Sequence, residues 1–350
     1  MQTLFVLKHL CFGVVIAVFS AILTRISISK IAAFDEPNER SSHTVVTPRG
    51  GGVAIFAGFF LGVLLIQWLG DVSPISSDYF LGFVASTIIV GVLSFYDDFF
   101  QVSFKIKLVG QFLAIAIAML AGLLVDKLHF AIIGEVNLGF WAYPLTFVWM
   151  FGMTNAYNFI DGLDGFAAST AFVVAVFFAY ITASQGSYFV YLASLSLAAA
   201  TLGFLFYNWS PAKIFMGDIG STFLGLTFAT LAIIAARYDH SHTSFWVMPL
   251  LVFHYIFHTV FTFVRRLMAK ENVFLPHRTH IYQLLNRIGY THRQVALGYA
   301  GLAVIQGLAA TWMVQNLTEG RGLIYIPFTL LYFVAAIAIV KQSRRRGISA

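Results

Sequence analysis

The sequence predicts an all-α, polytopic membrane protein, and composition, hydropathy and long apolar runs carry this prediction. Of the 350 residues, 59% are hydrophobic and only 10% are charged, whereas about one quarter of an average soluble domain is charged. The mean hydropathy is +0.83. So few charges cannot cover a water-soluble body of this size, and such high hydrophobicity also excludes intrinsic disorder.

The chain contains eleven apolar runs, each close to the roughly 20 residues that a membrane-spanning helix needs. The runs lack the alternating pattern of strands, so we expect helices. The predicted spans are Leu4–Leu23, Val53–Leu69, Tyr79–Phe95, Leu108–Leu124, Phe140–Asn158, Ala167–Ala183, Tyr188–Tyr207, Thr222–Ala236, Phe245–Val264, Val295–Val314 and Leu323–Val340. Together they predict a single integral membrane domain over residues 1–350.

Lys and Arg are distributed unequally between the two sides of these spans. With the N-terminus outside, 17 of the 21 Lys and Arg residues lie in cytoplasmic segments, and positively charged loops stay on the cytoplasmic side. We therefore expect a periplasmic N-terminus, a cytoplasmic C-terminus and a functional site in the cytoplasmic loops. Nucleic acid is not an expected partner, because no basic patch is interleaved with base-stacking aromatic residues.

The first predicted cytoplasmic loop, Phe34–Gly52, combines two prolines with a glycine triplet. The prolines forbid a continuous helix. The triplet Gly50–Gly52 lacks Cβ atoms, so its backbone N–H groups could approach an anion, with Arg49 beside them. Arg49 and Gly51 are therefore candidates for substrate binding. The alternative is a flexible loop that leads into a glycine-rich helix start.

Two adjacent acids, Asp97 and Asp98, lie at the inner end of the third predicted span. Neighbours on a helix point about 100° apart, so the two carboxylates face different targets. One could meet a cation and the other a substrate or a basic side chain. The alternative is a solvated helix end balanced by Lys105 and Lys107, but adjacent acids repel each other there without an evident benefit.

Polar residues recur every three positions at the end of the fifth span: Asn155, Asn158, Asp161 and Asp164. This spacing drifts about 60° per step on an α-helix, so the four side chains cannot share one face. Gly162 and Gly165 indicate that the helix ends or tightens here. A broken helix would bend the polar stripe into a cavity.

Asp218 lies between two glycines just before the eighth span, with Asn208 ten residues upstream. An acid at such a helix start suits a metal or phosphate site, although a helix-capping aspartate gives the same pattern. Taken together, the acids and amides of the inner segments are oxygen ligands without thiolates. They predict Mg²⁺, or Mn²⁺ in its place, and phosphate chemistry.

The longest predicted cytoplasmic loop, Arg265–Arg293, is rich in His and Arg. Its residues His277, Arg278 and His280 suit phosphate contacts. Zinc is the alternative, although no third ligand lies at metal spacing. Four aliphatic residues follow helical spacing and predict a helix that lies in the membrane interface: Ile281, Leu284, Leu285 and Ile288.

The motifs, in this order and spacing, resemble the polyprenyl-phosphate N-acetylhexosamine-1-phosphate transferases, the MraY/WecA-like group of glycosyltransferase family 4. The resemblance covers roughly Phe34–Arg293 and rests on PNERSSH with TPRGGG, the DD pair, NAYNFIDGLDG, FMGDIGS and HRTHIYQ. It implies that a sugar 1-phosphate passes from a UDP-sugar to undecaprenyl phosphate at the cytoplasmic face of the bacterial inner membrane. UMP is released, and Mg²⁺ is needed.

The resemblance also implies residue roles. In the acidic pair, Asp97 and Asp98, one residue lies near the metal and one near the lipid phosphate, and Asp218 matches the metal-binding aspartate. The candidates are Asp97, Asp98, Asp161, Asp164 and His280 for catalysis, Asp218 and Asp98 for the metal, and Asn155, Asn158, Asn208, Arg49, Gly51, His277 and Arg278 for substrate binding.

One departure from the family concerns Tyr282 and Gln283, where close relatives carry further histidines. The strings RSSH and HIYQ look most like members that start O-antigen from UDP-N-acetyl-fucosamine or -quinovosamine type donors. The expected partners are a UDP-N-acetylhexosamine, undecaprenyl phosphate and membrane lipid, and a homodimer stays open. The alternative class is a transporter of a nucleotide-sugar or a lipid-linked precursor. Transporters usually place polar residues near the midplane and often contain repeats.

Overall fold

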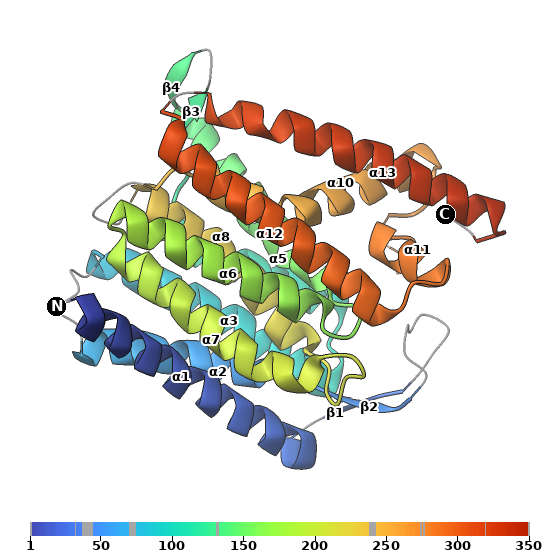
Figure 1. Ribbon diagram of the computed structural model, residues 1–350, viewed down its shortest axis with the longest axis horizontal. Coiled ribbons are helices and arrows are strands. Elements are labelled where there is room, and N and C mark those ends of the chain that lie inside the picture. Colours follow the sequence, from blue (N-terminus) through green and yellow to red (C-terminus); the bar gives the residue numbers. More distant parts are fainter. Residues whose placement is uncertain are drawn as a thin grey trace.

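The computed structural model confirms the all-α, polytopic membrane fold (Figure 1). It describes residues 2–31, 33–36, 45–69, 75–130, 133–237, 243–273, 275, 277–318 and 320–348. The motif PNERSSH, residues 37–43, lies outside the described residues.

Each of the eleven predicted apolar runs forms a helix. The helices are α1 Gln2–Ile26, α2 Gly52–Leu69, α3 Ser77–Phe100, α4 Phe104–Leu120, α5 Ala142–Ile160, α6 Phe166–Gln185, α7 Tyr188–Asn208, α8 Gly217–Arg237, α9 Val247–Leu251, α10 Phe253–Met268, α11 Ile281–Arg287, α12 His292–Asn316 and α13 Tyr325–Arg345. The ninth run is divided between α9 and α10, which meet at Val252.

Among the described helices, seven are long and apolar enough to cross a membrane by themselves: α1, α3, α6, α7, α8, α12 and α13. Helices α4 and α10 have only 17 and 16 residues, and α5 carries polar residues in its last turns. The apolar runs therefore predicted helices correctly, but not every run has the length or hydropathy of a complete span.

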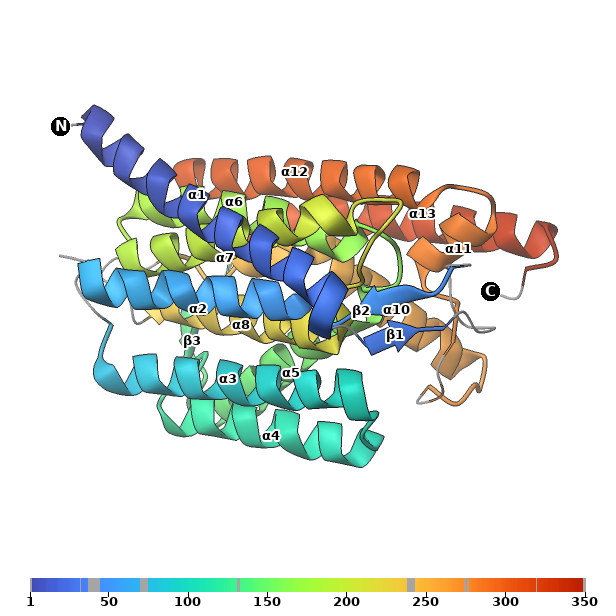
Figure 2. The same cartoon turned by 90° about the horizontal axis from the view of Figure 1, so that it is seen from below.

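Helix α8 is the centre of the bundle, because every residue from Ile219 to Ala235 is buried. Helices α2, α3 and α5 pack against it. Figure 2 shows α3 and α4 along one flank, and α12 and α13 along the opposite flank. On the outer helices many apolar side chains are exposed, such as Leu10 on α1 and Val334 on α13. A surface of this kind requires lipid as its solvent.

The two ends of the bundle differ. One end carries the N-terminus and the hairpin of β3 (Lys127–Phe130) and β4 (Gly134–Asn137). The other end carries the C-terminus, α11 and the antiparallel pair of β1 (Ala33–Asp35) and β2 (Thr47–Arg49) (Figure 1). Both strand pairs are too short to give a clear sequence signal and were not predicted. Opposite ends for the two termini agree with an odd number of crossings.

Candidate active site

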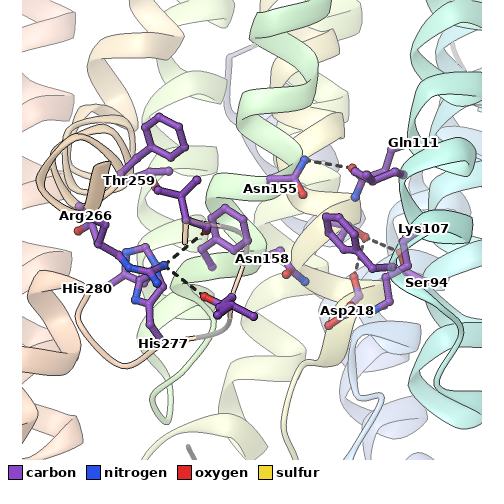
Figure 3. A pocket seen from close by; sticks show the side chains of 18 of the residues that line it. Ser94, Lys107, Gln111, Asn155, Asn158, Asp218, Thr259, Arg266, His277 and His280 are labelled. Atoms are coloured by element: carbon purple, nitrogen blue, oxygen red, sulfur yellow. Dashed lines mark hydrogen bonds and ion pairs between the residues drawn. The ribbon is translucent and has the colours of Figure 1, made fainter. Parts of the chain in front are cut away.

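A cavity of about 380 Å³ lies between α3, α4, α5, α8, α10 and the segment before α11 (Figure 3). Its lining brings together five of the predicted site residues: Asn155, Asn158, Asp218, His277 and His280. The two asparagines come from α5, the aspartate from α8 and the histidines from the longest predicted cytoplasmic loop. Segments far apart in the sequence thus share one cavity, as the motifs predicted.

One end of the cavity is acidic, and a lysine organises it. Lys107 of α4 places its Nζ atom 2.9 Å from Oδ2 of Asp218 and also forms an ion pair with the carboxylate of Asp97. Asp97 is buried near the end of α3, and Asp218 lies in the first turn of α8. Three helices therefore bring two carboxylates to one cation. We call Asp97, Lys107 and Asp218 the acidic cluster.

Asp98 has a different role from its neighbour. Its Oδ1 atom accepts a hydrogen bond from the backbone N–H of Asp218 at 3.0 Å, and its Oδ2 atom accepts one from Ile219 at 3.1 Å. The first N–H groups of a helix lack partners within the helix, so Asp98 caps α8 from another helix. Both of its oxygens face the α8 backbone in this structure, and metal binding by Asp98 stays a prediction.

The start of α8 fits this cap closely. Gly217 has φ +77°, and a Cβ atom there would collide with the Asp98 carboxylate. Arg49 fixes the same corner from β2, since its Nε and Nη2 atoms donate to the backbone oxygen of Asp98 at 3.1 and 2.6 Å. Arg49 thereby holds the end of α3, and its contact with substrate stays a prediction.

The glycine triplet forms a backbone junction rather than an open anion site. The N–H group of Gly51 donates to the carbonyl oxygen of Phe215 at 3.0 Å, and that of Gly52 donates to Met216 at 2.8 Å. A Cβ atom on Gly52 would overlap the backbone of Gly220. The N–H group of Gly51 is therefore used within the protein, and substrate binding at Gly51 stays a prediction.

The polar stripe of α5 is divided between the cavity and a loop. Asn155 donates to the side-chain oxygen of Gln111 at 3.0 Å, and Asn158 donates to the hydroxyl of Ser221 at 3.2 Å. Helix α5 ends at Ile160, so the two asparagines stay on the helix and the two aspartates follow in the loop. The prediction that the helix ends at the glycines is confirmed.

Asp161 follows directly after α5 and is partly buried. Burial and the nearby charges of Asp218 and Asp98 raise the pKa of Asp161 to about 8. Its carboxyl group is consequently mostly protonated at neutral pH in the metal-free protein. In that state it can donate a hydrogen bond as well as accept one.

Asp164 and Asn208 join two loops instead of lining the cavity. Asp164 accepts hydrogen bonds from Ser210 and from the N–H of Ala212, both at 3.2 Å, and pairs with His292 at 3.2 Å. Burial opposes ionisation, but the hydrogen bond and charge of His292 leave the pKa of Asp164 below its usual value.

Asn208 completes the same junction, because it accepts from the N–H of Gly165 at 3.1 Å and donates to the carbonyl of Ile214 at 2.9 Å. The polar atoms of Asp164 and Asn208 thus hold the loop after α5 against the loop before α8. Catalysis by Asp164 and substrate binding by Asn208 stay predictions.

The opposite end of the cavity is basic, and we call Arg266, His277 and His280 the basic cluster (Figure 3). Arg266 of α10 is buried and pairs with Glu271 at 2.8 Å. Its remaining guanidinium nitrogens donate to backbone oxygens of Asn272 at 2.8 Å and Leu275 at 3.2 Å. One arginine thereby folds the segment that leads to the two histidines.

The two histidines of the basic cluster lie with ring centroids 4.6 Å apart and ring planes tilted by 32°. Burial and the positive charges of Arg266 and Arg265 lower the pKa of His277 to about 4. Burial, His277 and the same arginines lower the pKa of His280 to about 3. Both rings are therefore neutral at physiological pH. They offer hydrogen bonds to a ligand rather than charge.

Helix α11 forms where the helical spacing predicted it, and its place at the membrane interface stays a prediction. Ile281 and Leu284 are buried against Ala336 and Val340 of α13, so the aliphatic stripe packs on protein. Just before this helix, Arg278 is half-buried, and its carbonyl oxygen accepts a hydrogen bond from Arg287 at 3.3 Å.

Lys107, Gln111 and Arg266 line the cavity but were not among the predicted site residues. A signal for the first two exists in the sequence: they lie four positions apart in an apolar run, which places them on one face of a helix. Arg266 gives no such signal, because an arginine at the end of a span is common on the cytoplasmic side.

An all-α membrane bundle with carboxylates, amides and neutral histidines around one cavity defines a class: a membrane-embedded enzyme for a phosphorylated substrate. Residues 80–236 match the family model described as glycosyl transferase family 4. Over 330 residues the chain is 36% identical to a Bacillus subtilis protein named "Probable undecaprenyl-phosphate N-acetylglucosaminyl 1-phosphate transferase", covering 93% of this chain and 88% of that protein.

Two further relatives agree with this assignment. The decaprenyl-phosphate N-acetylglucosaminephosphotransferase of Mycobacterium tuberculosis H37Rv is 30% identical over 308 residues, which are 81% of this chain and 76% of that protein. A phospho-N-acetylmuramoyl-pentapeptide-transferase of Pelagibacter ubique is 36% identical over 232 residues, or 57% and 62% of the two chains. The chain belongs to glycosyl transferase family 4 and is a multi-pass membrane transferase.

Proposed function

We propose that this protein transfers an N-acetylhexosamine 1-phosphate from a UDP-sugar to undecaprenyl phosphate at the cytoplasmic face of the bacterial inner membrane. UMP leaves, and the product starts a lipid-linked glycan such as O-antigen. The observation that carries the proposal is the cavity itself. It places the acidic cluster opposite the basic cluster, within a chain whose relatives are named as polyprenyl-phosphate sugar-phosphate transferases.

The two reacting groups are both anionic, and the cavity lining suits them. An oxygen of the lipid phosphate attacks the sugar-linked phosphorus, and the bond from that phosphorus to the bridging oxygen breaks as UMP leaves. A phosphate monoester has a second pKa of about 6, so most of the lipid phosphate is already the dianion at pH 7 to 8. The protein therefore needs to position and neutralise charge rather than to remove a proton.

Apolar side chains of α3 and α4 also line the cavity, among them Leu93 and Leu108. They suit the first isoprene units of a lipid whose tail stays in the bilayer. At the other side, the neutral rings of His277 and His280 suit hydrogen bonds to the donor, and Asn158 lies between the two clusters (Figure 3). We propose that the lipid phosphate lies beside the acidic cluster and the sugar and nucleoside of the donor beside the basic cluster, with the reacting diphosphate between the two.

The acidic cluster also suits a divalent cation. Asp97 and Asp218 already share the ammonium of Lys107, which marks their carboxylates as a place for positive charge, and their donors are oxygens, as Mg²⁺ or Mn²⁺ prefers. We propose that these two aspartates hold the metal. When bound there, Mg²⁺ would offset the negative charge of the diphosphate and make UMP a better leaving group.

A transporter is the alternative function. The named relatives are transferases, and the acidic residues lie at helix ends, at one end of the bundle, instead of at its middle. Both observations favour chemistry over transport.

The direct test is release of UMP by the protein purified in detergent. The reaction would contain undecaprenyl phosphate, Mg²⁺ and one of UDP-N-acetylglucosamine, UDP-N-acetylfucosamine or UDP-N-acetylquinovosamine. We expect UMP with at least one donor and no UMP when the lipid or the metal is omitted. Binding of the donors without UMP release from any of them would refute the transferase proposal.

Orientation needs a separate test. In a chain whose natural Cys11 is replaced by serine, single cysteines at Lys270 and at Glu135 would be treated with an impermeant thiol reagent in intact cells. We expect labelling at position 135 and protection at position 270, as the charge distribution predicts. Labelling of position 270 from outside would place the site on the wrong face for a cytoplasmic donor.

A further inference from the structure

Tyr282 replaces a histidine expected from the family pattern, and the structure gives it a contact of its own. Its side chain is 1% exposed, and its hydroxyl donates to the backbone carbonyl of Phe159 at 2.9 Å. Phe159 is in the last turn of α5, where carbonyl oxygens lack partners within the helix. The hydroxyl therefore connects α11 to the end of α5.

Aromatic side chains surround the ring of Tyr282, and a glycine leaves space for its hydroxyl. The ring lies 5.0 Å from that of Phe166 and stacks on His280 at 6.0 Å and 18°. His280 in turn stacks on Phe159 at 6.0 Å and 24°. A Cβ atom on Gly162 would collide with the Tyr282 hydroxyl, so the glycine of the loop after α5 makes room for this contact.

Two parts of the proposed donor site meet through this contact. Asn158 precedes Phe159 on α5, and His280 lies two residues before Tyr282, and both line the cavity. Movement at the hydroxyl would change the separation of the two donor-binding sides. The residues of the acidic cluster come from α3, α4 and α8, and none of them lies on α5 or α11, the two helices that this contact joins.

We propose that Tyr282 is a positioning residue that fixes the end of α5 against the basic cluster and thereby sets the donor site. The inference rests on the proposed function. Tyr282→Phe keeps the ring and removes only the hydroxyl. It should lower kcat/KM for the UDP-sugar roughly five- to tenfold, the scale of one neutral hydrogen bond, and leave KM for undecaprenyl phosphate unchanged.

The matched control is Tyr290→Phe, because Tyr290 follows α11 and is 48% exposed. This control should behave like the wild type in both kinetic constants. The positioning role is overturned if Tyr282→Phe has the donor kinetics of the wild type. It is also overturned if kcat/KM falls equally for the UDP-sugar and for undecaprenyl phosphate. The transferase function stands in both cases.

A double-mutant cycle makes the test sharper. Gly162→Ala adds a methyl group against the hydroxyl, so it should lower kcat/KM for the UDP-sugar when Tyr282 is present. In the Tyr282→Phe background the same substitution should have a several-fold smaller effect. Coupling of this kind is expected only for groups in contact. Additive effects of the two substitutions would contradict the proposed contact.

A measurement without substrate separates the two proposals. Hydrogen exchange of the α11 amides should be faster in Tyr282→Phe than in the wild type and unchanged in Tyr290→Phe, because α11 loses its tie to α5. If no donor supports UMP release in the wild type, the function fails, but the exchange data still decide on the contact. If Tyr282→Phe changes neither the hydrogen exchange of α11 nor the donor kinetics, the proposed role of the contact is refuted.

Discussion

The acidic and basic clusters face each other across one cavity but are built differently. The acidic cluster comes from membrane helices, and its charges are paired with each other: Lys107 contacts Asp97 and Asp218. The basic cluster comes from the end of α10 and a non-helical segment, which Arg266 holds by binding Glu271 and backbone oxygens. The helices of the bundle thus hold the charged side chains of the acidic cluster in place. The hydrogen-bonding histidines of the basic cluster instead lie on a loop that one side chain, Arg266, holds.

The largest effect is expected from Asp218→Asn in the acidic cluster. The substitution keeps the size of the side chain but removes the charge that would offset Mg²⁺. Turnover should fall by at least ~10²-fold, the scale observed when a key electrostatic group is removed. Asp126→Asn is a suitable control, because Asp126 pairs with Arg237 at 2.8 Å on the far side of the bundle. Normal turnover at ordinary Mg²⁺ would reject the role of Asp218.

A smaller but substantial effect is expected from Lys107→Met. Without the ammonium, Asp97 and Asp218 repel each other unless a divalent cation replaces it. We expect turnover to fall roughly tenfold and the Mg²⁺ concentration for half-maximal rate to change. Lys105→Met is the comparison within the same helix turn, since Lys105 is not among the residues that line the cavity. Identical metal titrations for Lys107→Met and wild type would separate Lys107 from the metal site.

Substitution in the basic cluster should weaken binding of the UDP-sugar without changing how that binding depends on pH. His280→Phe preserves an aromatic ring against Phe159 but removes the ring nitrogens, so KM for the UDP-sugar should rise several-fold, the scale of a lost hydrogen bond. The pKa of His280 is about 3, so the wild-type ring is neutral throughout pH 6 to 8.5. The ratio of mutant to wild-type KM should be constant over this range. A ratio that changes steeply with pH would mean that the charged ring binds the donor.

A different kind of effect, on stability and not on turnover, is expected from Asp161→Asn in the absence of metal. The pKa of Asp161 is raised to about 8 in the folded protein and is about 3.9 in an unfolded chain. A raised carboxyl pKa means that the folded state loses stability as the pH rises from about 4 to 8. The asparagine variant lacks this loss, so its Tm should exceed that of the wild type by more at pH 8.5 than at pH 5. Equal differences at both pH values would contradict the raised pKa.

The sequence predicted the helices and the cavity residues on regular elements well. Asn155 and Asn158 line the cavity as expected, because helical spacing determines where they point. It could not separate Asp97 from Asp98, since two adjacent acids look alike until the start of α8 takes the carboxylate of Asp98. The role of Lys107 likewise depends on three helices meeting, which no local pattern contains.

Glycines were the least predictable feature. A triplet such as Gly50–Gly52 is compatible with an anion site or with close backbone packing. Which of the two forms depends on whether another segment of the chain accepts hydrogen bonds from its N–H groups. Here the carbonyl oxygens of Phe215 and Met216 take the N–H groups of Gly51 and Gly52. Only the tertiary fold shows that partner.

The junction of Gly52 with Gly220 has a consequence for how the protein is made. The start of α2 leaves the ribosome about 170 residues before the start of α8, a delay of roughly ten to thirty seconds at ~5–20 residues per second. Until α8 is inserted, Gly51 and Gly52 have no carbonyl partners from Phe215 and Met216. The junction between the start of α2 and the start of α8 is therefore completed late in biogenesis. A nascent chain that stops before α8 carries the first motifs in the membrane without the surface that organises them.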